Sequence, residues 1–278
     1  MQFCSFLLFN AGIFGLAATP VLLPVLQSLG IPQKTVGGAF GALQLMLYEV
    51  VFPWLPLTAI FLTAILMGRA LCGWACPFGF VQDLLAYVKG KHAKVSPRTH
   101  GGLVKVKYLI LVIVLFISGT LAVSSIVGTG QEYRRSLGEF AKAPFNVLSP
   151  SDTLFAALPR FIFDARYSPI ALPTLLFWVR LAIMVGVLIF AVYVERSWCR
   201  YFCPLGAFMA VLNRFSFLGL KRNPTKCTKA GCRECIEVCP TKVPILDLPW
   251  EKFTHPECIY CLKCVEACST RAIRPKFP

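Results

Sequence analysis

Two runs of four cysteines near the C-terminus constrain this chain more than any other feature of its sequence. The first run has the pattern C-x4-C-x2-C-x3-C and consists of Cys227, Cys232, Cys235 and Cys239. The second has the pattern C-x2-C-x2-C-x3-C and consists of Cys258, Cys261, Cys264 and Cys268. Such spacing is typical of paired [4Fe–4S] sites, in which three cysteines of one run and the fourth cysteine of the other hold one cluster.

This crossed pattern predicts two ligand sets. One cluster takes Cys227, Cys232, Cys235 and Cys268, and the other takes Cys258, Cys261, Cys264 and Cys239. Cys227 departs from the usual pattern, because four residues rather than two separate it from the next cysteine of its run. The alternative is structural zinc, which usually binds two C-x2-C pairs joined by a longer spacer.

Long apolar stretches dominate the rest of the chain. Hydrophobic residues make up 56% of the 278 residues and charged residues only 15%, whereas a soluble protein has about 25% charged residues. Because about 20 apolar residues cross a bilayer, we predict four membrane spans: about Phe3–Leu26, Pro53–Met67, Tyr108–Val127 and Leu175–Val194. The shorter, glycine-rich segment Val36–Phe52 is predicted to be re-entrant or interfacial.

Basic residues indicate how these spans are oriented. The formal net charge is +15, and the connection from Arg69 to Lys107 contains seven Lys or Arg residues and one acid. The part of the chain from Glu195 onward contains fourteen Lys or Arg residues. Since cytoplasmic loops carry the excess of Lys and Arg, we expect a multi-pass protein of the cytoplasmic membrane, with both termini and the clusters on the cytoplasmic side. No nucleic-acid partner is expected, because no binding motif accompanies the positive charge.

An internal repeat relates two parts of the apolar region. Arg69, Cys72, Cys76, Pro77 and Gly79 recur 127 positions later as Arg196, Cys199, Cys203, Pro204 and Gly206. The spacing within each C-x3-C-P motif would place both sulfurs on one face of a helix, and the proline would end or kink that helix. Four thiolates from the two packed repeats could hold a third iron–sulfur centre. A redox-active dithiol and a simple packing role are the alternatives.

These features predict a mainly α fold class with two domains. Residues 1–220 are expected to form a membrane domain, a bundle of four transmembrane helices with an internal repeat and two C-x3-C-P motifs. Residues 221–278 are expected to form a small cytoplasmic α+β domain, ferredoxin-like, that holds two [4Fe–4S] clusters.

Other polar residues in the apolar region are weaker candidates. Arg180 lies near the outer end of the fourth predicted span, where it could be functional or extend its charge to the membrane surface. Glu49 could take a proton from a quinol, although a solvated interfacial acid is the simpler interpretation. Cys4 stands alone, as buried packing cysteines often do. No catalytic residue is assigned, and substrate chemistry is expected in a partner or at a quinone site.

The segments GRALCGWACPFGFVQDLL and ERSWCRYFCPLGAF, followed by the two cysteine runs, resemble the NapH/NosR-type polyferredoxin membrane proteins. The resemblance extends from the first predicted span to Arg274. It implies four spans, cytoplasmic clusters, and electron flow between a quinone pool or cytoplasmic donor and another redox protein. That family serves periplasmic nitrate and nitrous-oxide reductase systems, and this sequence is closer to its short, quinol-oxidising branch.

The leading hypothesis is therefore an electron relay to a partner redox enzyme, with the C-x3-C-P pairs between the clusters and the membrane. The expected partners are membrane lipid, a redox protein or subunit, and a quinone whose site the sequence does not define. The alternative is an assembly or maturation factor whose clusters reduce a metal or thiols during metalloenzyme biogenesis. Removing the protein after its partner has matured separates the two, because only a relay is then still needed for electron flux.

Overall fold

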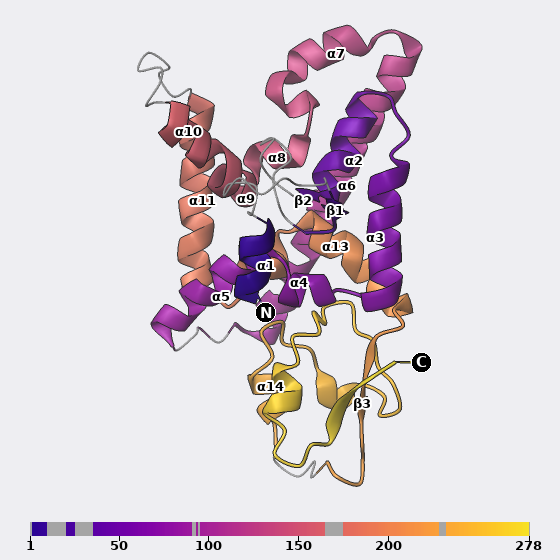
Figure 1. Cartoon of the computed structure of the whole chain (residues 1–278), viewed down its shortest axis with the longest axis vertical. Coiled ribbons are helices and arrows are strands. Elements are labelled where there is room, and N and C mark those ends of the chain that lie inside the picture. The colour runs from indigo at the N-terminus through magenta and orange to yellow at the C-terminus, as the bar shows by residue number, and fades with distance from the viewer. Residues whose placement is uncertain are drawn as a thin grey trace.

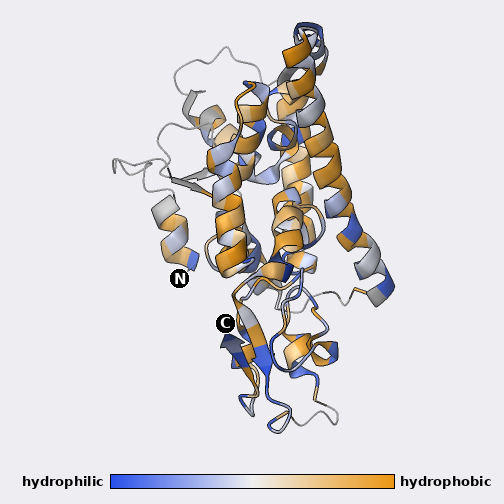
Figure 2. Ribbon diagram, turned by 90° about the vertical axis from the view of Figure 1, so that its right-hand side faces the viewer, coloured by the Kyte–Doolittle hydropathy of each residue, from blue (hydrophilic) through white to orange (hydrophobic). Residues whose placement is uncertain are grey.

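The computed structural model describes residues 2–9, 21–25, 36–90, 93, 95–164, 175–227 and 232–277. Within these residues the protein is mainly helical, and a small C-terminal domain lies at one end of the helical part (Figure 1). Apolar residues dominate the helices, whereas hydrophilic residues are more frequent in the small domain (Figure 2). The predicted mainly α class is thus confirmed.

The elements of the helical part up to Tyr193 fall into two groups along the chain. Those up to Val127 are α1 (Gln2–Phe9), β1 (Val21–Leu23), β2 (Val36–Gly38), α2 (Ala39–Tyr48), α3 (Trp54–Met67), α4 (Ala70–Trp74), α5 (Pro77–Lys89) and α6 (Pro97–Val127). Short elements then lead to the next long helix: α7 (Gly130–Leu137), η2 (Gly138–Ala141), α8 (Pro144–Leu148), α9 (Pro150–Asp152), η3 (Thr153–Ala157), α10 (Leu158–Asp164) and α11 (Leu175–Tyr193). β1 and β2 form a parallel pair, with Val21 opposite Val36.

Among the described residues, two helices are long and apolar enough to cross a membrane. They are Arg98–Val127 of α6 and Leu175–Tyr193, which is α11, and they correspond to the third and fourth predicted spans. α3 covers the second predicted span but has only 14 residues, fewer than the about 20 that cross a bilayer. The expected bundle of four transmembrane helices is therefore not confirmed.

The prediction of one continuous span over Phe3–Leu26 is wrong at Val21–Leu23. α1 covers Gln2–Phe9, residues 10–20 lie outside the described part, and Val21–Leu23 form strand β1. Pro20 and Pro24 flank this strand in the sequence. Proline lacks an amide donor and disfavours helical backbone in the residue before it, so apolar composition alone does not continue the helix here.

The repeat in the sequence is also a repeat in the fold. Each copy consists of an apolar helix, a five-residue helix and a helix that begins with proline. They are α3, α4 and α5 in the first copy, and α11, α12 (Ser197–Tyr201) and α13 (Pro204–Leu212) in the second. α5 packs on α11, and α13 packs on α3 and α6, so the two copies are interleaved. Their shared core includes Phe78, Trp198, Leu205 and Met209.

The small domain has its own apolar core and one pair of antiparallel strands. After η4 (Asn213–Phe215), its elements are β3 (Gly219–Arg222), α14 (Glu234–Glu237), η5 (Ile245–Asp247), α15 (Lys263–Glu266) and β4 (Ile273–Lys276). β3 pairs with β4, and Leu220 also bridges to Phe253. This combination agrees with the expected small α+β domain, while the boundary after residue 220 stays a prediction.

Candidate metal centres

Four cysteines drawn from both runs line a cavity in the core of the small domain, which we call the buried cavity. They are Cys239, Cys258, Cys261 and Cys264. The other lining residues are mostly apolar: Leu220, Thr241, Val243, Ile245, Phe253, Ile259, Tyr260 and Leu262. Burial disfavours an uncompensated thiolate, and together with repulsion from Cys239 and Cys261 it raises the pKa of Cys264 to about 12.

The other four cysteines of the two runs line a second cavity, which we call the outer cavity. They are Cys227, Cys232, Cys235 and Cys268. Cys232 is exposed and Cys227 and Cys268 are half-buried. Arg222, Ala272 and Ile273 from the strand pair and the turn before β4 complete the wall on one side. This cavity therefore lies nearer to solvent than the buried one.

The fourth cysteine of each run lies in the cavity of the other run, and both have similar surroundings. Cys239 Sγ accepts a hydrogen bond from the Val243 amide (3.4 Å), and Cys268 Sγ accepts one from the Ala272 amide (3.3 Å). Cys268 Sγ also lies 3.6 Å from Thr270 Oγ1. Burial alone would raise the pKa of Cys268, but these hydrogen bonds lower it. The ligand sets themselves stay a prediction.

Single-ion sites are a separate question from cluster sites. Within the described residues, no three or more His, Cys, Asp or Glu side chains form a group that could hold one metal ion. The eight thiols line the walls of two cavities instead.

The cysteines of the two C-x3-C-P motifs come together where the repeats meet. Cys76, Cys199 and Cys203 are buried and Cys72 is half-buried. Burial, together with the nearby thiols of Cys76 and Cys72, raises the pKa of Cys199 to about 12, and Gln82 Nε2 donates to its sulfur at 3.2 Å. Burial and the three neighbouring thiols also raise the pKa of Cys203. Four thiolates here would repel one another unless a bound cation compensated their charge.

The two cysteines of each motif do not lie on one helix, contrary to the prediction. Cys72 lies within α4, whereas Cys76 is the N-cap of α5 and Pro77 is the first residue of α5. The second copy is built in the same way. Proline needs no amide donor at the first helical position and is favoured there, so it begins a new helix. At this N-terminus Cys203 Sγ accepts a hydrogen bond from the Gly206 amide (3.2 Å), which has no partner within the helix.

The arginine of each repeat copy donates a hydrogen bond to a backbone carbonyl oxygen of the other copy. Arg69 Nη2 donates to the carbonyl oxygen of Cys199 (3.4 Å), and Arg196 Nη1 donates to that of Cys72 (2.8 Å). Both arginines are buried, and Arg196 is also paired with Asp83, whose Oδ1 lies 2.7 Å from Arg196 Nε. Burial would raise the pKa of Asp83, but this pairing lowers it. Both arginines belong to the repeat in the sequence, but the repeat alone gives no indication of their role.

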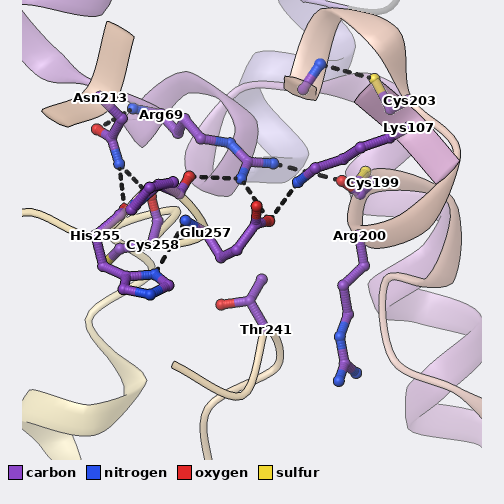
Figure 3. Close-up of polar contacts among 12 residues, drawn as sticks. Arg69, Lys107, Cys199, Arg200, Cys203, Asn213, Thr241, His255, Glu257 and Cys258 are labelled. Atoms are coloured by element: carbon purple, nitrogen blue, oxygen red, sulfur yellow. Dashed lines mark hydrogen bonds and ion pairs between the residues drawn. The ribbon is translucent and has the colours of Figure 1, made fainter. Parts of the chain in front are cut away.

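A buried network of charged side chains joins the helices to the loop that precedes Cys258 (Figure 3). The Glu257 carboxylate accepts hydrogen bonds from Arg69 Nη1 (3.1 Å), Lys107 Nζ and Tyr108 Oη (3.2 Å). Burial alone would raise the pKa of Glu257, but Arg69 and Lys107 lower it below its ordinary value. Neither Glu257 nor Lys107 is predicted from the sequence, because a single acid or lysine carries no local signal that it is buried.

The turn of the first C-x3-C-P motif makes a direct backbone contact with the second cysteine run. A Cβ atom at Gly73 would lie 2.4 Å from the Ile259 carbonyl oxygen, so only glycine permits this approach. Next to it, Trp74 Nε1 donates to the carbonyl oxygen of Tyr260 (2.8 Å). The turn of the motif therefore lies against Ile259 and Tyr260, two residues that line the buried cavity.

The other sequence candidates lie outside both cavities. Cys4 and Glu49 are exposed, and Arg180 is half-buried in α11. Next to Glu49, the Tyr48 ring lies 4.4 Å from the Arg134 guanidinium, which also donates to the Tyr48 carbonyl oxygen (2.7 Å). These surroundings do not assign the three residues a function.

Comparison with known proteins identifies the family. A model described as a 4Fe-4S binding domain matches residues 50–95 and 176–223, which contain the two C-x3-C-P motifs. A model described as a 4Fe-4S dicluster domain matches residues 219–269, which contain both cysteine runs. The ferredoxin-type protein NapH of Haemophilus influenzae is 26% identical over 76% of this chain and 63% of its own length. The chain is a NapH/NosR-type polyferredoxin.

The polyferredoxin is also similar to two further proteins. The methylamine utilization ferredoxin-type protein MauN of Methylobacillus flagellatus is 26% identical over 76% of this chain and 62% of its own length. The uncharacterized protein MJ0750 of Methanocaldococcus jannaschii is 28% identical over 78% of this chain and 76% of its own length. The polyferredoxin thus spans less than two thirds of NapH and MauN, and no solved structure matches it.

Proposed function

We propose that this polyferredoxin is a membrane-embedded iron–sulfur electron carrier. It relays electrons between a quinone pool or a cytoplasmic donor and a partner redox enzyme. The observation that carries this proposal is that eight cysteines line two cavities, four at each. At each cavity three of the cysteines belong to one run and the fourth belongs to the other run. The two family models for 4Fe-4S binding support the same type of cofactor.

The cysteines around each cavity fit one [4Fe–4S] cluster. Cys258, Cys261, Cys264 and Cys239 hold one cluster, and Cys227, Cys232, Cys235 and Cys268 hold the other. Such clusters, when bound, supply reversible one-electron transfer. The chain binds them through deprotonated thiols and donates amide hydrogen bonds to Cys239 and Cys268. It also surrounds the buried site with apolar side chains. Burial and hydrogen bonds to sulfur are its means of setting the reduction potentials.

A third iron–sulfur centre belongs to the same proposal, held by the four cysteines of the C-x3-C-P motifs. They are Cys72, Cys76, Cys199 and Cys203. The buried guanidinium groups of Arg69 and Arg196 lie beside these thiols, where positive charge favours the thiolate form. The match of a 4Fe-4S binding domain model to both segments supports this assignment. The contact at Gly73 is consistent with electron transfer between this centre and the buried cavity.

The proposed membrane location rests on the outer surfaces of α6 and α11. Phe116 and Ile126 of α6, and Leu175 and Ile189 of α11, are all more than half exposed. Extended apolar surface of this kind is stable in contact with lipid rather than water. The excess of Lys and Arg from Glu195 onward supports a cytoplasmic small domain, with both termini on the same side. Quinone binding stays a prediction.

Pairs of cysteine substitutions test the crossed ligand sets. We expect Cys268→Ala to remove about four iron atoms per chain. Adding Cys235→Ala should remove no more iron, because both thiols serve one cluster, whereas adding Cys264→Ala should remove about four further atoms. Iron analysis of anaerobically purified protein measures these losses. Cys4→Ala, which changes an exposed cysteine outside both cavities, is the control.

The opposite pattern of additivity would contradict the crossed sets. If Cys268→Ala and Cys264→Ala together remove only about four iron atoms, each run holds its own cluster. If neither single change alters the iron content, the runs do not bind iron–sulfur clusters.

A further inference from the structure

A basic hollow lies on the small domain next to the outer cavity. It has a volume of about 370 Å³, and its lining includes Lys221, Lys226, Trp250, Glu251, Arg271 and Arg274. The hollow lies where β3 ends and β4 begins, because Arg222 and Ile273 are opposite each other in the strand pair. In Figure 1, β3 lies in the small domain below the helices, so the hollow belongs to the part of the protein proposed to face the cytoplasm.

Four of the basic side chains in this hollow are exposed. They are Lys221, Lys226, Arg271 and Arg274. None of the four forms an ion pair with any described residue. Glu251 is the one acidic residue in the lining, and Trp250 is 52% exposed at the same place. The hollow therefore presents concentrated positive charge together with an exposed aromatic ring, a combination that favours an anionic partner.

The hollow shares part of its wall with the outer cavity. Arg222 and Ala272 line both. The Ala272 amide donates to Cys268 Sγ (3.3 Å), and its carbonyl oxygen accepts from the Asn223 amide (2.8 Å). One residue thus separates the floor of the hollow from a predicted cluster ligand. A partner that covers the hollow would lie closer to the outer cavity than to the buried one.

We propose that this hollow is the docking site for an acidic one-electron carrier protein. The proposal rests on the function proposed above and adds to it the place and the chemistry of the soluble partner. An acidic patch around the carrier's redox group faces the four exposed cations, and Trp250 packs against its apolar centre. The reduced carrier would give one electron to the [4Fe–4S] cluster that Cys227, Cys232, Cys235 and Cys268 would hold. The carrier is oxidised, the cluster is reduced, and no covalent bond forms or breaks.

Charge reversal in the hollow tests this docking site on the full-length protein in lipid nanodiscs. The probe is a reduced acidic flavodoxin, whose absorbance differs from that of iron–sulfur clusters. We expect Lys226→Glu with Arg274→Glu to lower the second-order rate of electron transfer at least about tenfold at low salt, and the difference to disappear at high salt. Binding of the oxidised flavodoxin, which requires no electron transfer, should weaken about as much.

The control carries the same change in charge at a distant surface. Arg135→Glu with Lys142→Glu alters exposed residues in and just after the α7–η2 region, and α7 lies at the opposite end of the molecule from the small domain (Figure 1). This variant should keep the parent rate and affinity. Equal loss in both double variants, or no loss in the Lys226/Arg274 variant, would overturn the docking site.

Reduced methyl viologen, a small cation, separates this proposal from the function on which it rests. All variants should accept electrons from it at least as fast as the parent protein, because exchanging basic for acidic side chains does not repel a cation. Failure of the parent protein to accept electrons from the viologen would overturn the electron-carrier function itself. Normal reduction by the viologen, with a flavodoxin rate that is insensitive to the Lys226/Arg274 changes, would overturn only the docking site.

Discussion

Glu257→Ala is expected to destabilise the protein by about 3–5 kcal/mol. The substitution leaves Arg69 and Lys107 buried without the anion that they share. Removing one partner of a buried ion pair lowers the free energy of unfolding by more than the intact pair adds to it, because the remaining charge stays buried without a partner. The network also joins α6 and the turn before α4 to the loop in front of Cys258, so the variant should hold the small domain against the helices less firmly.

Thermal unfolding in detergent under anaerobic conditions measures this effect. The matched control is Glu266→Ala, which removes an exposed acid of the same domain and should change stability by about 0.5 kcal/mol or less. Glu257→Gln keeps an acceptor oxygen and should lose less stability than the alanine variant. An unfolding temperature for Glu257→Ala equal to that of the control would show that the buried network does not stabilise the protein.

Cys203→Ala is expected to reduce the iron content by about four atoms per chain, by removing the proposed centre between the two repeats. Cys72→Ala, in the other copy of the repeat, should produce the same loss. The double variant should lose no more than either single variant, because both thiols would serve one centre. The EPR signals from the two clusters of the small domain should remain in all three variants.

The same variants also address the redox-dithiol and packing alternatives. Under either alternative the parent protein holds about eight iron atoms, and neither Cys203→Ala nor Cys72→Ala lowers that number. Iron losses that add up in the double variant would mean that the two copies bind metal separately. Cys4→Ala again serves as the control for the loss of a cysteine outside these groups.

The grouping of the cysteines around the two cavities agrees with the spacing of the runs, and the ligand sets stay a prediction, whereas the membrane part differs from the predicted bundle. The spacing of the two cysteine runs is enough to predict that Cys239 and Cys268 exchange cavities, because a short loop can place only three of its thiols around one cluster. The repeat at 127 positions likewise predicts two similar units, and the structure contains them. Apolar composition is a weaker guide, since it cannot distinguish the 14-residue helix α3 or the strand at Val21–Leu23 from part of a spanning helix.

Other features depend on contacts between distant segments and have no local signal. Pro77 and Pro204 were expected to end or kink a helix. The helix before each proline does end, at Trp74 and Tyr201, but each proline also begins a new helix, which the sequence pattern did not predict. The exchange of hydrogen bonds by Arg69 and Arg196 follows from the interleaving of the two copies. The burial of Glu257 follows from the contact of the small domain with the helices, which a sequence pattern does not encode.

Iron and acid-labile sulfide per chain, measured on anaerobically purified protein together with EPR after dithionite reduction, decide whether this protein carries iron–sulfur clusters. We expect about twelve iron atoms and a similar amount of sulfide, with interacting S = 1/2 signals from the clusters of the small domain. Zinc without iron or sulfide would contradict the assignment of this protein as an iron–sulfur electron carrier.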